Sequence, residues 1–469
     1  MDTTLDFIKE RMTTKDDVRA ALEGYRVRLK AANLAEGMTE ALITELGKIS
    51  ALRVISRQSM MQYKGTRKSA PQIAKELNVE AVIEGSLIRA GDRVRISVQL
   101  IQAVPERHLW ANSYDRDLRD VLALHSEMAH AVASEVRAKL TQQERSLLAA
   151  TRPVDPEVYA AYLRGRYFWN RTYLDKALAA FQEAIRKDPS YAPAHAGVAL
   201  CYSLLSLSQP PKEVFPKARA AAIKTLELDE TVEDAHTAMA WIDTIFEWDW
   251  AAGERELKRA LELNPQSGWA HRIYGLTLTM TGRPQEGIAE AIQAQQSDPL
   301  SLLMNTQLAI NYFFAHRYDD AIAQNKKTLE LDPNFAPARK YLFWCYTMKG
   351  MYSEALAEYT DYKKLPETDE DRPHLTYLYA KSGRSRDALK LVQELRRLSD
   401  REYVDPGDWV IAYAALDKNQ AFEWLDRAYE ARSPWMAFVK VNPFLEPLRS
   451  DPRFQGLLRR TNFPLTSPQ

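Results

Sequence analysis

Two histidines around a glutamate come closest to a known catalytic spacing. His125 and His130 flank Glu127 in the segment HSEMAH. A zinc-binding helix places two histidines four residues apart so that both project from one face, whereas a separation of five rotates them apart by about 140°. We therefore expect these side chains to be solvated helix residues and not metal ligands.

The other residue types that could do chemistry show no catalytic pattern. Cys201 and Cys345 each lie inside an apolar run with no histidine nearby in sequence, which indicates small core residues and neither a disulfide nor a nucleophile. Neither GxxxxGK[ST] nor GxGxxG occurs, and the kinase phrases HRD and DFG are missing. We predict that the chain is not an enzyme and that it has no catalytic residue, no metal and no cofactor.

Four prolines mark a regular period in the second part of the chain. Pro189, Pro265, Pro299 and Pro333 close the similar phrases AIRKDP, ALELNP, AQQSDP and TLELDP. The last three are 34 residues apart. The gap before them is two periods plus eight residues, with Glu230 where a further proline would fall. A fixed period of this length predicts a stack of helix pairs.

The period and the residues inside it resemble the tetratricopeptide repeat, which pairs two antiparallel helices through a tight turn. Counted from Val158, the signature positions hold Gly165, Phe168, Ala177, Phe181, Ala184 and Pro189. We predict about eight units over residues 156–433. A capping segment with a polar-faced helix at 452–460 is expected after them, because the last unit has no neighbour to cover it. The histidines at position 4 of successive units are expected to pack and not to bind metal; they are His195, His236 and His271.

The resemblance implies that the first helix of each pair lines a concave groove, chiefly through repeat positions 2, 5, 9, 12 and 13. Aromatic and basic residues, the types that most often carry interface energy, occupy many of these positions. The predicted partner-binding residues are Tyr162, Arg166, Trp169, Asn170, Trp241, Arg272, Phe313, Lys340 and Trp344. Further residues at these positions are Thr279, Thr306, Ile310 and Thr347.

Two interpretations of these residues remain open. In the first, they bind an extended or helical peptide that carries acidic and apolar groups. In the second, half of the aromatics simply pack between repeats. The clamp that some relatives use for a terminal carboxylate is not expected, because Tyr162 and Arg166 stand where lysine and asparagine would be needed.

The amino-terminal third follows a different pattern. Apolar residues over 37–49 share one helical face, and a second helix is expected to begin with Pro71 in its first turn. Residues 81–89 and 93–101 predict a hairpin, because apolar and polar residues alternate along the second segment. A short β-rich run at 52–56, a third strand at 108–114 and an amphipathic helix at 121–140 complete a small α+β domain.

Three phrases of this region resemble the TolB-amino-terminal-like domain of multidomain bacterial signalling proteins. They are EGMTEALITELGKISALRVISR, EGSLIRAGDRVRISVQLI and HLWANSYDRDLRDVLALHSEMAHAVASEV. The resemblance implies an effector ahead of the domain, which can be a winged-helix DNA-binding domain, a Ser/Thr kinase or an adenylate cyclase, and repeats after it as an interaction platform. Such an effector is absent from this sequence. The first strand of that domain would fall at Tyr25–Leu29, which could equally continue a helix from Asp16.

The predicted fold class is therefore mostly α, with a small α+β domain followed by an α-helical tetratricopeptide solenoid. We divide the chain into an amino-terminal extension (1–33), the TolB-like domain (34–145), the solenoid (156–433) and a capping segment (434–469).

Composition narrows the possible partners. Lys+Arg and Asp+Glu each total 63 of the 469 residues, so the net charge of zero offers no field that would attract nucleic acid or an anionic membrane. No apolar run of about 18 residues and no signal peptide is found. We predict a protein or peptide partner, no nucleic acid, no membrane insertion and a cytoplasmic location, with the oligomeric state left open.

Two functions follow from these observations. The first is a scaffold that binds a peptide or protein partner in its groove, within bacterial signalling. The second is the sensory or regulatory portion of a truncated or split signalling protein, namely a kinase, an adenylate cyclase or a winged-helix regulator.

Overall fold

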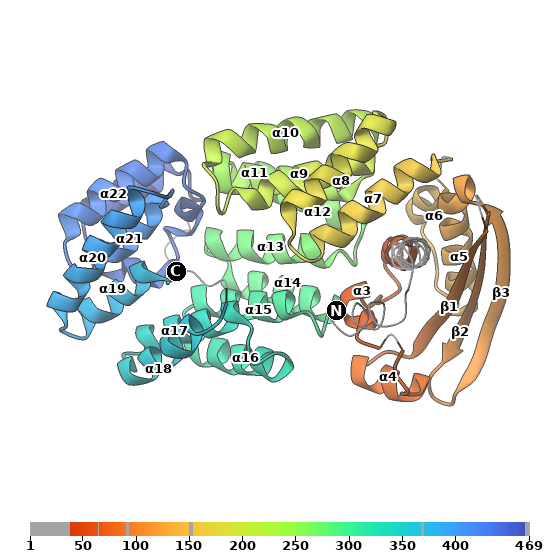
Figure 1. Ribbon diagram of the computed structural model, residues 1–469, viewed down its shortest axis with the longest axis horizontal. Helices are drawn as coiled ribbons and strands as arrows, with labels where there is room; N and C mark the ends of the chain where they lie inside the picture. The colour runs from red at the N-terminus through yellow and green to blue at the C-terminus, as the bar shows by residue number, and fades with distance from the viewer. Residues whose placement is uncertain (1–37, 64, 91–92, 150–152, 367–369, 465–469) are drawn as a thin grey trace, which may run out of the picture. The chain divides into compact units, whose positions relative to one another are not determined.

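The computed structural model describes residues 38–63, 65–90, 93–149, 153–366 and 370–464 (Figure 1). The chain forms two compact units, and each is described by itself. Unit 1 comprises Met1–Leu52 and Gly65–Tyr191, and unit 2 comprises Arg53–Lys64 and Ala192–Gln469. The predicted first strand at Tyr25–Leu29 lies outside the described residues. Helices dominate both units, and the predicted class of a mostly α chain with a small α+β part and a tetratricopeptide-like solenoid is confirmed.

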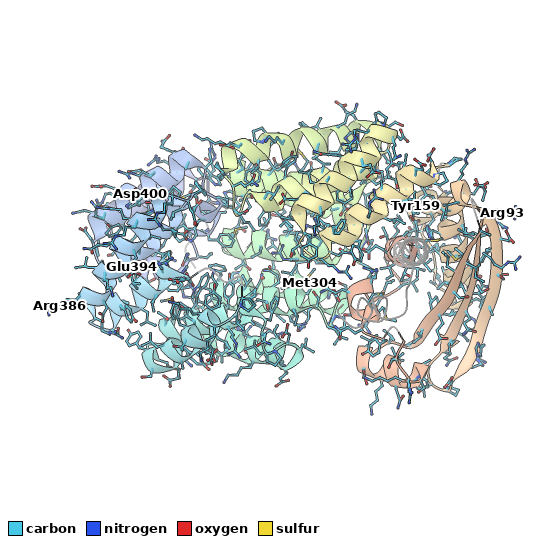
Figure 2. The ribbon with its side chains drawn as sticks, in the orientation of Figure 1. Arg93, Tyr159, Met304, Arg386, Glu394 and Asp400 are labelled. Atoms are coloured by element: carbon cyan, nitrogen blue, oxygen red, sulfur yellow. The ribbon has the colours of Figure 1, made fainter. Side chains whose placement is uncertain are left out.

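Unit 1 contains a three-stranded antiparallel sheet in the order β1-β2-β3. The strands are β1 (Ala81–Ala90), β2 (Arg93–Gln102) and β3 (Arg107–Asp117). Leu87 faces Ile96 across the first pair, and Leu100 faces Trp110 across the second. The predicted hairpin is confirmed by the antiparallel pairing of β1 with β2. Strand β2 buries Val94, Ile96 and Val98, whereas Arg93 at its start is exposed (Figure 2).

Helices cover one side of this sheet. A helix over 38–47 is followed by α4 (Ala70–Leu77), η1 (Leu118–Asp120), α5 (Val121–Glu135) and α6 (Gln142–Ala149). Helix α4 contacts β1, and α5 contacts β3. Ser69 and Gln72 form a capping box, and Pro71 lies in the first turn as predicted. The helix expected over 121–140 ends at Glu135, and Arg137 follows it with a positive φ of 56°.

The β-rich run predicted at 52–56 is wrong. These residues form no strand, and Arg53–Lys64 belongs to unit 2. The segment carries the short helix α3 (Arg57–Met61). Its backbone and side chains bind the turn at residues 297–300: Ser56 N donates to the Ser297 carbonyl over 2.7 Å, and the Ser59 hydroxyl donates to Asp298 over 2.5 Å. Non-local hydrogen bonds therefore override the local β propensity.

Eight consecutive helix pairs follow in the described part of the chain. The first pair, α7 (Pro156–Trp169) and α8 (Leu174–Lys187), belongs to unit 1. The others form unit 2: α9 (Ala192–Leu205) with α10 (Pro211–Leu228), α11 (Glu233–Ile242) with α12 (Trp250–Leu263), α13 (Gly268–Thr281) with α14 (Pro284–Ser297), α15 (Leu302–Phe314) with α16 (Tyr318–Leu331), α17 (Ala336–Met348) with α18 (Tyr352–Lys363), α19 (Arg372–Lys381) with α20 (Ser385–Ser399) and α21 (Pro406–Ala414) with α22 (Lys418–Ala431).

Glycines allow the two helices of a pair to cross closely. A Cβ atom added at Gly165 would meet the ring of Phe181 at 2.4 Å. In the pair α13/α14, a Cβ atom at Gly275 would lie 2.8 Å from the Gly287 carbonyl. The Asn311 side chain of α15 donates to both glycine carbonyls, over 2.8 and 3.1 Å. The close crossing is thus linked to the next repeat by hydrogen bonds.

Residues at position 4 bind the turn that begins their own repeat. The imidazole Nε2 atoms of His236 and His271 lie 3.0 Å from the carbonyls of Glu230 and Pro265, six residues earlier. Asn305 and Arg339 reach Pro299 and Pro333 in the same way, over 2.8 and 3.1 Å. The turn residues that set the 34-residue period thus supply the carbonyls to which the side chains at position 4 bind. His236 and His271 have the structural role that was predicted for them.

The end of the chain folds back onto the first helices of unit 2. It comprises η3 (Pro434–Phe438), η4 (Pro443–Leu448) and α23 (Pro452–Arg460), and we call residues 434–464 the C-terminal segment. Phe438 stacks on Phe314 with ring centroids 4.9 Å apart, and the Lys440 ammonium donates to the Thr281 carbonyl over 2.9 Å. Unit 2 therefore buries a core shared between this segment and several repeats.

Candidate functional site

The predicted groove residues of α7 are engaged within unit 1. The half-buried Tyr162 packs against Phe181 and Tyr191, with centroid separations of 5.9 and 5.4 Å. Arg166 lies 3.5 Å from a carboxylate oxygen of Glu40 and 5.3 Å from the Trp169 ring. Asn170 follows as the carboxy-terminal cap of α7. These four residues therefore lie together on α7 of unit 1, and the other five predicted residues belong to unit 2.

In unit 2 the C-terminal segment packs on predicted groove residues. Phe444 is 1% exposed, and its ring centroid lies 6.0 Å from that of Phe313 and 5.8 Å from that of Trp344. Phe313 is fully buried, so its assignment to a partner-binding surface is corrected: it is a core residue of unit 2. Trp241 is 6% exposed and belongs to the same core.

Trp344 takes part in a buried polar network. Its indole donates to Asp371 over 2.7 Å, and it stacks on His374 with a centroid separation of 4.0 Å. His374 Nδ1 lies 2.6 Å from the other oxygen of Asp371. Burial by itself would raise the pKa of Asp371, but His374 and Lys340 outweigh it and lower that pKa to about 2. Asp371 is thus a buried anion that is held by its neighbours.

The remaining predicted residues, Arg272 and Lys340, lie earlier on their helices than the residues that the C-terminal segment covers. Arg272 is half-buried, and its guanidinium carbon lies 4.4 Å from the centroid of the Trp269 ring. Lys340 approaches the Trp344 ring at 5.7 Å, and Tyr341 stacks edge-on against Trp344 at 4.6 Å. Helix α15 contacts both α13 and α17, and these residues occupy equivalent or neighbouring repeat positions on the first helices.

We call the half-buried and exposed side chains at these positions the cation–aromatic surface. It consists of Trp269, Arg272, Leu303, Lys340 and Tyr341. Trp269 and Leu303 both occupy repeat position 2, which is one of the expected groove positions, but neither is among the predicted partner-binding residues. The sequence contained a signal for Leu303, because a large apolar residue at a repeat position that faces outward indicates a contact surface. In the structure Leu303 is 37% exposed.

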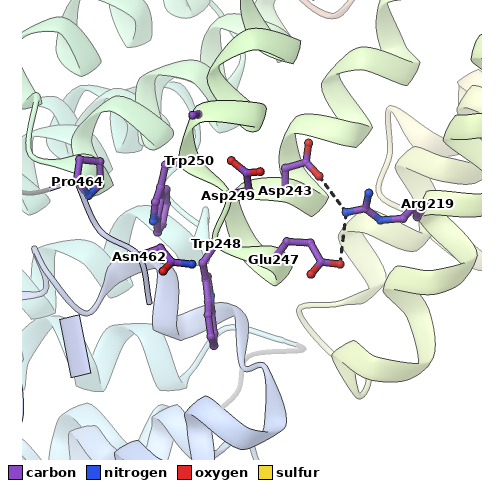
Figure 3. Close-up of a pocket in the computed structure, with 9 residues that line it drawn as sticks. Arg219, Asp243, Glu247, Trp248, Asp249, Trp250, Asn462 and Pro464 are labelled. Atoms are coloured by element: carbon purple, nitrogen blue, oxygen red, sulfur yellow. Dashed lines mark hydrogen bonds and ion pairs between the residues drawn. The ribbon is translucent and has the colours of Figure 1, made fainter. Parts of the chain in front are cut away.

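A second feature of unit 2 is an open pocket of about 820 Å³ beside a π-helical turn, η2 (Asp243–Glu247) (Figure 3). Arg219 donates to Asp243 over 2.9 Å and to Glu247 over 3.4 Å (Figure 3). Burial raises the pKa of Asp243 despite this arginine. Trp248 and Trp250 form the aromatic wall of the pocket, and the Trp250 indole donates to the Thr461 carbonyl over 3.1 Å. The pocket is thus a charged site whose carboxylates already share a cation.

Residues with catalytic potential are accounted for within the described part of the chain. Cys201 and Cys345 are both buried, as predicted, and burial raises the pKa of Cys345. Described His, Cys, Asp and Glu side chains form no group of three that could hold a metal ion. His125 is 1% exposed, so the expectation that it is solvated is wrong: it faces Tyr159, and burial lowers its pKa to about 4.

Among the helices described, none combines the length and apolarity needed to cross a bilayer.

Comparison with known proteins gives partial matches. No family model matches the chain, so the resemblance to the TolB-amino-terminal-like domain is not confirmed. "Putative adenylate cyclase 3" of Rhizobium meliloti (strain 1021) is 37% identical over 169 residues, which cover 35% of this chain and 29% of that protein. "Superkiller complex protein 3" of Mus musculus is 25% identical over 258 residues, which cover 52% of this chain and 16% of that protein. The matched region thus spans less than a third of the length of either relative.

Solved structures with a similar fold are more distant. TTC0263, a thermophilic TPR protein of Thermus thermophilus, is 19% identical with a TM-score of 0.34, and the match covers 39% of this chain and 96% of that one. A human IFIT1 dimer solved with PPP-AAAA is 14% identical with a TM-score of 0.46, and the match covers 74% of this chain and 82% of that one.

The IFIT1 structures correct one prediction, namely that nucleic acid is excluded as a partner. Two of these structures, which match 74% of this chain, were solved with PPP-AAAA and m7Gppp-AAAA. The physical reason is that net charge is a sum over the whole chain. Zero net charge is compatible with a local group of cations.

Proposed function

We propose that this chain is a scaffold that binds a protein or peptide partner along the first helices α13, α15 and α17 of unit 2. The observation that carries this proposal is the cation–aromatic surface. Its arginine and two aromatic side chains are of the types that anchor protein interfaces, and Leu303 adds an exposed apolar contact.

The position of the C-terminal segment limits where the partner binds. The segment contacts the later parts of these helices, through Thr281, Phe314 and Trp344. A partner that used those positions would have to displace Phe444, which is buried among aromatic rings. The earlier positions, which include Trp269 and Arg272, are the part of the face that we assign to the partner.

Site-specific photo-crosslinking tests this proposal. A photoreactive residue at Leu303 on α15 is compared with one at Lys327, an exposed position on the second helix α16. We expect one defined protein adduct from Leu303, and none from Lys327, in cells that produce the full chain. Equal labelling from both positions, or the absence of an adduct at Leu303, would contradict the proposal. An adduct with nucleic acid at Leu303 would replace the protein partner by a nucleic acid.

A second candidate function is regulation of a cyclase, and the match to "Putative adenylate cyclase 3" favours it. In this role the chain would act as a non-catalytic part that changes the rate of a catalytic partner. The test adds the purified chain to the catalytic part of the Rhizobium meliloti relative and measures the conversion of ATP to cyclic AMP. A rate that depends on the amount of added chain supports this role, and a constant rate at every ratio contradicts it.

A further inference from the structure

Strand β3 ends the sheet of unit 1 with a free edge. The sheet has the order β1-β2-β3, so β3 pairs with β2 along one side, and no described strand pairs with its other side (Figure 1). In the middle of β3, Ala111, Asn112 and Ser113 are all exposed. Asn112 lies opposite the buried Val98, so it belongs to the face that the helices cover, and its exposure shows that their cover ends before this edge. Within the described residues, the edge is therefore accessible to another strand.

The edge of β3 has few of the features that prevent pairing. Natural sheets block an edge with lysine or proline, a bulge or a very short strand. Strand β3 has 11 residues without lysine or proline, and it bulges near its start, at Leu109, so Trp110–Asp117 is regular. The Ser113 amide donates to the Asn112 side chain over 2.8 Å, which indicates that it points to the free edge. Backbone groups alternate in direction along a strand, so those of Ala111 point the same way.

The residues of this edge complement themselves when two copies run antiparallel. With Asn112 opposite Asn112 of a second copy, Ala111 lies opposite Ser113 of that copy. These two residues have backbone groups that point outward, so they form the hydrogen-bonded pairs of the ladder. Trp110 then lies opposite Tyr114 of the second copy, and aromatic pairs of this kind stabilise sheets. Trp110 is only half-buried in its own chain, so part of its ring is available for this contact.

Charge selects the antiparallel direction. Strand β3 begins with Arg107 and ends with Asp117, and both residues are exposed. An antiparallel pair brings each arginine toward the aspartate of the other copy. A parallel pair would bring two arginines together at one end and two aspartates at the other, and like charges across an interface are costly. Arg116, which precedes Asp117, lies 3.4 Å from Glu127 of its own chain, so the end of the strand stays acidic.

We propose that β3 forms a two-fold antiparallel pair with β3 of a second copy of this chain, centred on Asn112. The two three-stranded sheets then join into one continuous sheet. A two-fold pairing uses the same edge of both copies, so the assembly closes as a dimer. The paired segment is short, and we expect a dissociation constant of about 10–100 μM, as a small interface gives. The inference uses residues of unit 1 alone and does not depend on the proposed function.

A charge exchange at Asn112 of the full chain tests the two-fold axis. Asn112→Lys places two lysines opposite each other, and Asn112→Asp places two aspartates there. Each variant alone should associate at least about tenfold more weakly than the wild type. An equimolar mixture should recover the dimer, because a lysine then faces an aspartate. Ser86→Lys, at an exposed position of β1, is the matched control and should leave association unchanged. Sedimentation velocity measures association, and an unchanged Tm shows that each variant is folded.

A disulfide across the axis tests the register. Two residues opposite each other in a non-hydrogen-bonded pair have Cα atoms about 4.5 Å apart, which a disulfide can span. Asn112→Cys should therefore give a covalent dimer under mild oxidation. Ser113→Cys should give much less, because Ser113 faces Ala111 of the second copy and not its own equivalent. Cys201 and Cys345 are buried and do not compete.

Four outcomes overturn the inference. A wild-type chain that sediments as a monomer at about 200 μM would show that the edge does not bind a second copy. Dimers of equal strength from both charged variants and from their mixture would place the contact elsewhere on the chain. Equal crosslinking of Asn112→Cys and Ser113→Cys would exclude the register. Species that grow beyond a dimer would mean that the strand binds a different edge of the next copy. None of these outcomes affects the Leu303 crosslink, so the proposed function is tested separately.

Discussion

The imidazole Nδ1 of His236 lies 2.6 Å from a carboxylate oxygen of Glu256, while Nε2 of the same ring lies 3.0 Å from the Glu230 carbonyl. The next repeat has the same arrangement, because His271 lies 2.6 Å from Glu290 and 3.0 Å from the Pro265 carbonyl. A single side chain thus joins the first helix, the second helix and the turn that begins the repeat.

This geometry predicts a stability that depends on pH. Burial lowers the pKa of His236, but hydrogen bonds to Glu256 and to the Glu230 carbonyl outweigh it, so the pKa is raised above its usual 6.5. Because the folded state binds the proton more tightly, the stabilisation is fully present below pH 6.5 and is lost as the pH rises through the raised pKa.

We therefore expect His236→Gln to lower the free energy of unfolding by about 1–2 kcal/mol at pH 5.5 and by less at pH 8.5. Urea unfolding at both pH values measures this difference. His108→Gln, at an exposed position of β3, is the control and should change neither value. A cost for His236→Gln that grows with pH would show that the sign is wrong.

Asp371 predicts the opposite pH dependence. Its pKa is lowered to about 2, so its contribution is present above the ordinary aspartate pKa near 3.8 and is lost as the pH falls through 2. Asn tolerates the positive φ of 34° at this position, so Asp371→Asn removes the charge with little change to the backbone. At pH 7 we expect a loss of about 3 kcal/mol, because His374 loses its buried partner.

Urea unfolding between pH 7 and pH 3 tests the Asp371 prediction, since the difference between wild type and variant should shrink as the pH falls. Asp400→Asn, at an exposed position after α20, serves as the control. A difference that stays constant over this range would mean that the carboxylate is not held as an anion.

The crossing of α13 and α14 predicts a steep effect for a single methyl group. In Gly275→Ala the new Cβ atom would lie 2.8 Å from the Gly287 carbonyl and 3.2 Å from the Ala291 backbone nitrogen. Both contacts are with backbone, so the helices must move apart, and we expect a loss of about 2–3 kcal/mol. In Gly456→Ala on α23, the Cβ atom would meet nothing within 4 Å, and we expect a gain of about 0.5–1 kcal/mol from helix propensity. Thermal unfolding of both variants compares them directly.

Phe444 tests the packing of the C-terminal segment. Its ring lies 4.6 Å from His374 and 4.9 Å from Tyr377, in addition to its contacts with Phe313 and Trp344. We expect Phe444→Ala to lower the free energy of unfolding by about 3–5 kcal/mol and to make Trp344 more accessible to a soluble quencher. Leu207→Ala, where the side chain is 63% exposed, should cost little. Loss of stability without greater quenching would mean that the segment stays in place without its phenylalanine.

Much of the fold was predictable because its signals are local. The alternation in β2 determines which face is buried, and the proline period places each helix pair. The glycine and alanine positions of the repeat indicated close helix crossings, and Gly165 against Phe181 shows one of them. The run at 52–56 was not predictable, because its hydrogen bonds reach a turn more than 200 residues away.

The candidate site was predictable in part. Repeat position selected Arg272 and Lys340 correctly as residues of the first helices, but the same rule selected Phe313, which is buried. Position within a repeat specifies the direction of a side chain and not what lies opposite it. Likewise, the spacing of His125 and His130 ruled out a shared metal face without revealing that His125 is buried against Tyr159.

The amino-acid sequence alone determined that helix pairs follow a small sheet. The 34-residue repeat period and the alternation of apolar and polar residues in β2 are both patterns within one element or one repeat, so they can be read along the chain. Only the tertiary structure decided that residues 434–464 pack on later positions of the first helices, at Thr281, Phe314 and Trp344. That outcome depends on the burial of aromatic side chains from segments as far apart as Trp250 and Phe463, whose rings stack 4.7 Å apart, and no local pattern records such a contact.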